Sequence, residues 1–137
     1  MSLSIVIPCK NEEIIIKRTV EIILNIIKDI DIDIELIIID DFSDDQTYQI
    51  VKSLNKNNKK IKLIKNINHG GLGEAIKLGI NNSSKKYLCF FMADMSDSVE
   101  DVIKYYNEIS KDDLDAVLGS RFIKGSKKID YPKKKLI

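Results

Sequence analysis

The chain has 137 residues, of which 44% are hydrophobic and 31% charged, and its net charge at pH 7 is +1. This length suits one domain with a buried hydrophobic core. The net charge is close to zero, so it gives no sign of the basic surface that binds nucleic acid. No apolar run approaches the roughly 20 residues that span a bilayer, and Met1 leads directly into a predicted strand without a signal peptide. Cys9 and Cys89 have no metal or redox spacing, so we expect core thiols in a cytoplasmic, reducing compartment.

The first half of the chain predicts alternating strands and helices. Residues 4–8 are an apolar run ended by proline, and Asn11 is placed to cap the helix that follows. That helix is indicated by apolar residues at three- and four-residue spacing: Ile16, Val20, Ile23, Ile27 and Ile30. Residues 34–39 predict a second strand, with Glu35 as its one polar residue, and acidic residues 40–45 follow it. A second helix and a third strand over residues 61–64 come next.

The second half continues the alternation. A glycine-rich turn at residues 68–73 opens a helix, and residues 87–93 form an apolar run that predicts a strand buried on both faces. An acidic corner at residues 94–97 precedes another amphipathic helix, and residues 115–119 predict a fifth strand. Strands that alternate with helices indicate an α/β fold with a mostly parallel sheet flanked by helices.

Three polar clusters fall directly after predicted strands, at residues 8–12, 40–45 and 94–97. Ligands bind outside the carboxyl ends of strands in open α/β sheets, so these clusters are expected to share one site. Asp94, Ser96 and Asp97 offer the hard oxygen ligands that Mg²⁺ or Mn²⁺ accepts. Carboxylates beside a glycine turn suit a nucleotide diphosphate held through such a cation, with Asp41 accepting hydrogen bonds from a base or ribose.

Other interpretations of the same residues stay open at this point. Ser96 or Asp97 could simply cap the following helix. The glycine turn could belong to a dinucleotide fingerprint with Asp94 as its ribose acid, although Ile76 occupies the position of the third small residue. The lysines near the C-terminal end could face phosphates or an anionic membrane, or form a solvated tail.

Taken together, these motifs resemble family 2 glycosyltransferases of the GT-A fold, and within them the dolichol-phosphate mannosyltransferase and polyprenyl-phosphate glycosyltransferase group. The resemblance covers essentially the whole chain, and it rests on several motifs in order at family spacing. The matching stretches are Ile7-Pro8-Cys9-Lys10-Asn11-Glu12, Asp40-Asp41-Phe42-Ser43-Asp44-Asp45-Gln46-Thr47, the turn and helix from Asn68 to Gly79, and Gly119-Ser120-Arg121-Phe122.

The resemblance implies a GT-A-like (Rossmann-like) domain over residues 1–137 that transfers a sugar with inversion in cell-envelope glycan biosynthesis. The donor would be a UDP- or GDP-sugar, and the acceptor a polyprenyl phosphate at the cytoplasmic face of a membrane. The nucleotide-sugar would lie along Pro8, Glu12, Asp41, Ala93 and Asp94. Asp94, Ser96 and Asp97 would hold Mg²⁺ or Mn²⁺, and the catalytic residues would be Asp94 and Arg121, the latter meeting a phosphate.

Two departures from the family pattern shape further expectations. The family's metal motif is usually Asp-x-Asp, but Met92 stands at the first position, and a thioether is a poor ligand for a hard cation. Either Asp97 supplies the second carboxylate or the metal is held more loosely. Family members also run well past the motif that ends at Phe122, so we expect the domain to be incomplete at its C-terminal end. Both points favour a second hypothesis, a non-catalytic nucleotide-sugar-binding module.

Overall fold

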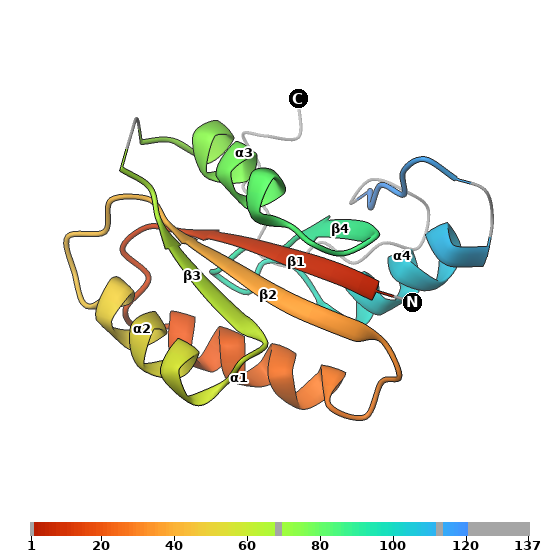
Figure 1. Cartoon of the computed structure of the whole chain (residues 1–137), viewed down its shortest axis with the longest axis horizontal. Coiled ribbons are helices and arrows are strands. Elements are labelled where there is room, and N and C mark those ends of the chain that lie inside the picture. Colours follow the sequence, from red (N-terminus) through yellow and green to blue (C-terminus); the bar gives the residue numbers. More distant parts are fainter. Residues whose placement is uncertain (1, 68–69, 112–113, 121–137) are drawn as a thin grey trace, which may run out of the picture. The chain divides into compact units, whose positions relative to one another are not determined.

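The computed structural model describes residues 2–67, 70–111 and 114–120, in which four strands alternate with four helices (Figure 1). The elements are β1 (Ser2–Cys9), α1 (Ile16–Ile27), β2 (Asp33–Asp40), α2 (Thr47–Asn57), β3 (Ile61–Lys65), α3 (Leu72–Asn82), β4 (Tyr87–Phe90) and α4 (Val99–Lys111). The chain divides into two compact units, Met1–Ile103 and Lys104–Ile137, and the first contains the sheet. No helix within the described ranges is both long and apolar enough to cross a membrane.

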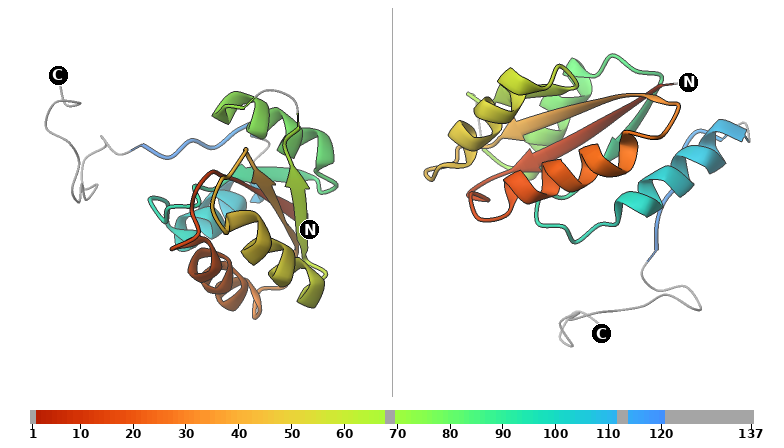
Figure 2. Two further views of the ribbon diagram at one scale, coloured as in Figure 1. Left: turned by 90° about the vertical axis from the view of Figure 1, so that its left-hand side faces the viewer. Right: turned by 90° about the horizontal axis from the view of Figure 1, so that it is seen from below.

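The four described strands form a parallel sheet in the order β3-β2-β1-β4. Helices α1 and α2 cover one face of this sheet and α3 covers the other (Figures 1 and 2). Because β1 and β2 are central, their side chains are buried on both faces, which explains their almost continuous apolar sequences. The predicted α/β class and parallel sheet are confirmed.

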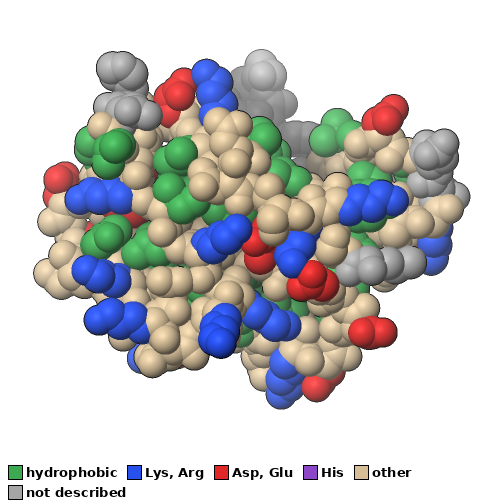
Figure 3. All heavy atoms as spheres, viewed as in Figure 1, with side chains coloured by type: hydrophobic (Ala, Val, Ile, Leu, Met, Phe, Trp, Pro, Cys, Tyr) green, Lys and Arg blue, Asp and Glu red, His purple; other side chains and the backbone are tan. Residues whose placement is uncertain are grey.

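Helix α3 packs unusually close to β1 at Gly79. A Cβ atom at this position would lie 2.2 Å from Cγ1 of Val6, so only glycine allows the observed approach. Val6 and Ala75 are fully buried in the same cluster. Leu72 and Ile80 of α3 are exposed, and hydrophobic side chains are visible on this side of the molecule in the space-filling view (Figure 3).

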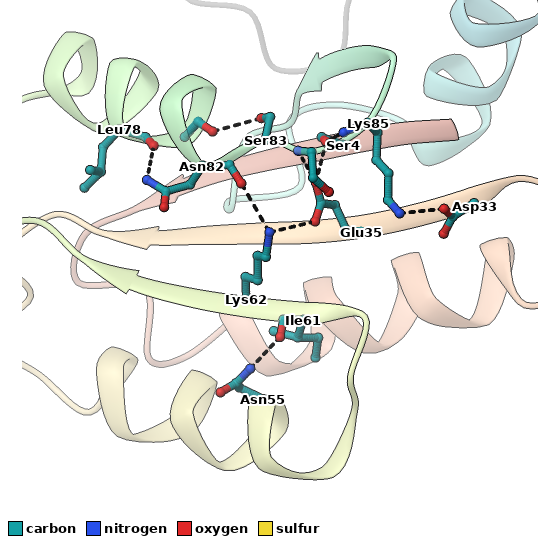
Figure 4. Close-up of polar contacts among 12 residues, drawn as sticks. Ser4, Asp33, Glu35, Asn55, Ile61, Lys62, Leu78, Asn82, Ser83 and Lys85 are labelled. Carbon is teal, nitrogen blue, oxygen red and sulfur yellow. Dashed lines mark hydrogen bonds and ion pairs between the residues drawn. The ribbon is translucent and has the colours of Figure 1, made fainter. Parts of the chain in front are cut away.

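Glu35 is the polar residue inside β2, and a dense network explains its presence there (Figure 4). Its Oε1 accepts hydrogen bonds from the Ser4 hydroxyl at 2.7 Å and from the Ser84 backbone N–H at 2.7 Å and hydroxyl at 2.9 Å. Lys62 forms an ion pair with its Oε2 at 3.1 Å. Partial burial opposes ionisation and would raise the pKa of Glu35. The hydrogen bonds together outweigh this effect and lower the pKa to about 2. The network joins β1, β2 and β3 at the amino end of the sheet, opposite the predicted site.

Two strand predictions are corrected. The strand expected over residues 87–93 ends at Phe90 and is half-buried rather than buried on both faces, because β4 lies at an edge of the described sheet; Phe90 is 44% exposed. The fifth strand expected over residues 115–119 is absent from the described part of the chain, where Leu118 is 89% exposed. A short apolar run becomes a strand only beside a hydrogen-bonding neighbour, and the described ladders pair only β1 with β2, β1 with β4, and β2 with β3.

Candidate functional site at the carboxyl edge of the sheet

The loops that follow β1 and β2 are joined into one structure at the carboxyl edge. Five hydrogen bonds connect them, each between a backbone N–H of one loop and a side chain of the other. The donor–acceptor pairs are Asn11 N to Ser43 Oγ, Glu12 N to Thr47 Oγ1, Glu13 N to Asp45 Oδ2, Asp44 N to Asn11 Oδ1, and Gln46 N to Glu13 Oε2. All five span 2.8 to 3.1 Å. The edge is therefore preorganised, since these loops hold each other in place.

This arrangement corrects the cap predicted at Asn11. The residue that directly precedes α1 is Ile15, and the Asn11 side chain accepts from Asp44 N instead. Asn11 also has a φ of 55°, a left-handed conformation that asparagine tolerates. A pattern of Asn followed by acidic residues predicts a local cap, but here the tertiary contact between loops takes the side chain.

Glu12 links the first two clusters to the third. Its side chain is partly buried, and this burial raises the pKa of Glu12, with further contributions from the negative charges of Asp94 and Asp45. Because β2 and β4 both pair in parallel with β1, the loops after these three strands leave the sheet at the same edge. Pro8 lies in the same region, buried in β1 and opposite Ile39 of β2.

Beneath this surface lie a buried thiol and a buried carboxylate. Asp40 is fully buried, and neither of its carboxylate oxygens has a hydrogen-bond partner within the part of the chain that is described. Its neighbour across the ladder, Cys9, donates its thiol to the Ile39 carbonyl at 3.4 Å. Burial, followed by the charge of Asp40, raises the pKa of Cys9 to about 12, so Cys9 is a core thiol and no nucleophile.

Asp41 anchors the glycine-rich turn that precedes α3. Its Oδ1 accepts the Asn66 side-chain amide and its Oδ2 accepts Gly71 N, each at 2.8 Å. Helix α2 begins at Thr47, whose N–H donates to Asp45 Oδ1 at 2.9 Å, and the N-cap residue Gln46 makes no side-chain cap bond. Both described bonds of the Asp41 carboxylate go to Asn66 and Gly71, so Asp41 is not a helix cap. Asn66 was not predicted, although its position directly after β3 is the available signal. Of the turn, residues 68 and 69 lie outside the described residues.

The acidic corner after β4 is a compact loop closed by its own carboxylates. Asp94 Oδ1 accepts Ser96 N at 3.0 Å, and Asp97 Oδ2 accepts Met92 N at 2.8 Å. Ala93, which is buried, accepts the Thr19 hydroxyl at 2.8 Å through its carbonyl, and this bond fixes the loop to α1.

Helix α4 is capped one residue beyond this loop. Ser98 Oγ accepts Asp101 N at 3.3 Å, so the alternative in which Ser96 or Asp97 caps the helix is wrong.

The acidic loop contains two carboxylates, Asp94 and Asp97, that are candidate ligands for a cation. No group of three or more His, Cys, Asp or Glu residues that could hold a metal occurs within the described ranges. Mg²⁺ is often bound through only one or two carboxylates together with substrate phosphates, so Asp94 with Asp97 suits a cation whose coordination a diphosphate completes. The remaining predicted phosphate ligand, Arg121, lies outside the described residues.

Comparison with known proteins gives a consistent result. The sequence model described as "Glycosyl transferase family 2" matches residues 4–137. The chain is 33% identical over 129 residues to a dolichyl-phosphate β-glucosyltransferase of Dictyostelium discoideum, covering 87% of this chain and 39% of that protein. It is 28% identical over 132 residues to a dolichol-phosphate mannosyltransferase of Pyrococcus furiosus, covering 96% of this chain and 36% of the relative. The chain thus spans less than two fifths of either relative's length.

A solved structure supports the fold. Glucosyl-3-phosphoglycerate synthase from Mycobacterium tuberculosis, in complex with Mn²⁺, UDP and glucosyl-3-phosphoglycerate, superposes with a TM-score of 0.64. The match covers 80% of this chain and 40% of that one at 21% sequence identity. At this identity the likeness establishes the GT-A type of fold alone.

Proposed function

The chain belongs to glycosyl transferase family 2, and from this we propose that it forms the nucleotide-sugar-binding domain, residues 1–137, of a glycosyltransferase. One observation carries the proposal: the parallel strands β1, β2 and β4 end at the same edge of the sheet, and the segments that follow them carry Glu12, Asp41 and Asp94. That edge is where open parallel sheets bind ligands.

The proposed roles follow from where each residue lies. Asp41 would accept an N–H of the base; each of its oxygens already holds one donor and has a second lone pair. Glu12, Pro8 and Ala93 would line the nucleotide and sugar. Asp94, assisted by Ser96 and Asp97, would face the diphosphate, and Arg121 would meet a phosphate of donor or acceptor.

Mg²⁺ or Mn²⁺ would fit at Asp94 and Asp97 because two carboxylates alone leave positions for diphosphate oxygens. Such a cation stabilises the negative charge that develops on a diphosphate leaving group. The chain's own contribution is to hold these carboxylates in position: Ser96 N binds Asp94, and Met92 N binds Asp97. The side chain of Met92 supplies no hard ligand, so Asp97 takes the place of the missing first carboxylate.

We propose transfer with inversion to a polyprenyl phosphate. An oxygen of the lipid phosphate would form the new bond to the anomeric carbon while the bond to the nucleoside diphosphate breaks. That oxygen is already anionic, so no protein base is needed. The two relatives described above are named as a dolichyl-phosphate glucosyltransferase and a dolichol-phosphate mannosyltransferase, and these names support this acceptor. The protein would then work as a peripheral protein at the cytoplasmic face of a membrane.

A second candidate function is nucleotide-sugar binding without catalysis. Met92 favours it, since this residue replaces a carboxylate in the metal motif. The two functions differ in turnover and share donor binding.

A thermal-shift screen with UDP-, GDP- and dTDP-sugars, each with and without Mn²⁺, tests the shared claim. A ligand that binds only the folded chain raises the free energy of unfolding, by about 2.7 kcal/mol at a free-ligand concentration of 100 times Kd. This added stability raises Tm. We expect one nucleotide class to raise Tm in the presence of Mn²⁺; no shift with any of them would contradict the proposal. A radiolabelled donor with polyprenyl phosphate then separates the candidates, because only the enzyme forms a labelled lipid.

A further inference from the structure

Phe42 has a backbone conformation that aromatic residues rarely adopt. Its φ is 60°, in the left-handed region that glycine favours. Such a conformation is unfavourable for a residue other than glycine and persists only where the surrounding structure fixes it. Hydrogen bonds hold the residues on either side of Phe42. Asp41 N donates to the Cys9 carbonyl, and Ser43 Oγ accepts Asn11 N. Residue 42 is therefore held by bonded neighbours on both sides.

The aromatic ring lies beside Asp41, against the glycine-rich turn. A Cβ atom built on Gly70 would lie 3.5 Å from Cδ2 of Phe42 and 3.8 Å from Oδ1 of Asp41. Ring and carboxylate thus flank the same backbone point. Phe42 remains 38% exposed, while Asp41 is only 6% exposed. The Phe42 ring is therefore accessible to a ligand, and it lies next to Asp41, which is almost entirely buried.

We propose that the Phe42 ring is the platform on which the nucleobase of the donor stacks. This inference rests on the proposed function. A nucleobase has an edge of hydrogen-bonding groups and an apolar face, and recognition requires a partner for each. Asp41 offers an acceptor for the edge, and Phe42 offers an aromatic surface for the face. Because Asp41 and Phe42 are consecutive and rigidly held, one ligand can meet both.

A simpler account gives Phe42 only a structural part, in which its ring covers Gly70 and steadies the turn. The two accounts differ in what a variant loses. A structural ring is replaced adequately by another apolar side chain of similar size, and its loss affects all ligands of the edge equally. A stacking ring requires aromaticity, and its loss affects only ligands that carry a base.

The test compares Phe42→Leu with Phe42→Tyr by titration calorimetry, using UDP, GDP and inorganic pyrophosphate in the presence of Mn²⁺. Removal of one stacking aromatic typically weakens binding by about 5- to 150-fold. We expect Phe42→Leu to lose at least about fivefold for the nucleotide that the wild type binds, and Phe42→Tyr to retain it. Pyrophosphate affinity should be the same in all three proteins. Equal nucleotide affinity in Phe42→Leu and wild type would overturn the inference and leave the proposed function intact.

A folding control and a spectroscopic probe complete the design. Phe42→Gly removes the ring and suits the left-handed backbone, so it should fold and still lose nucleotide affinity. The chain contains no tryptophan, so Phe42→Trp introduces a single tryptophan, whose emission nucleotide stacking should quench. Ile80→Trp, at an α3 residue that is 48% exposed, is the matched control and should not respond. Quenching of both or neither contradicts stacking at residue 42, and a wild type that binds no nucleotide contradicts the proposed function as well.

Discussion

Replacement of Gly79 by alanine should force α3 away from β1. The new Cβ would lie 2.2 Å from Cγ1, 3.1 Å from Cγ2 and 3.2 Å from Cβ of Val6. Rotation of the valine side chain cannot remove all three contacts, because its Cβ is fixed to the strand. Val6 is fully buried, so helix or strand must move within a close-packed interior.

The expected cost follows from two opposing effects. Overpacking of a core costs about 1–3 kcal/mol, whereas alanine is intrinsically about 1 kcal/mol better than glycine inside a helix. We therefore expect Gly79→Ala to lower the free energy of unfolding by up to about 2 kcal/mol in urea denaturation. The double variant Val6→Ala/Gly79→Ala should show favourable coupling, because the smaller residue on β1 makes room for the new methyl group.

Gly73 provides a matched control in the same helix. A Cβ at this position would meet nothing within 4 Å, so Gly73→Ala should raise the free energy of unfolding by about 0.5–1 kcal/mol. If Gly79→Ala proves as stable as Gly73→Ala, the close approach of α3 to β1 is not as described.

Two further predictions concern single carboxylates. Because the folded pKa of Glu35 is lowered to about 2, its ionised form contributes stability above about pH 4.5 that is lost as the pH falls toward 2, on the order of 3 kcal/mol in total. Urea denaturation of Glu35→Gln between pH 5 and 2 should accordingly give a flatter profile than wild type, and parallel profiles would refute this role. Asp41→Ala should lower both Tm and affinity for every nucleotide, since it removes a proposed base acceptor and leaves the buried Asn66 amide without this bond, at about 1–3 kcal/mol. Asn66→Ala breaks the same bond but keeps the carboxylate, so calorimetry should find its nucleotide affinity near wild type; a loss equal to that of Asp41→Ala would assign Asp41 to the turn alone.

The sequence predicts the repeating elements well because their signal is local. Buried apolar runs marked β1 and β2, and three- and four-residue spacing marked α1, where Ile16, Val20 and Ile23 are buried as expected. The clustering of polar loops at one edge also followed from sequence, since parallel strands end on the same side.

What the sequence did not reveal depends on partners far along the chain. Asn11 carries a cap-like signal, yet its side chain binds a loop 33 residues away. Residues 115–119 have strand-like composition, but composition cannot supply a neighbouring strand. The positive φ of Phe42 is likewise imposed by flanking tertiary bonds, and no propensity of phenylalanine points to it.

The central claim is that Asp94 holds a metal-bound nucleotide-sugar at the carboxyl edge. The most direct measurement is titration of the chain and of Asp94→Ala with the nucleotide-sugar selected by the thermal-shift screen, with Mn²⁺ and with a chelator. Loss of outer-shell partners costs 10- to 100-fold in metal affinity, so loss of a direct ligand should cost at least about 100-fold. We expect wild type to bind only with Mn²⁺, Asp94→Ala to show no measurable binding, and Asp97→Ala to weaken it. Unchanged affinity in a folded Asp94→Ala variant would contradict the account.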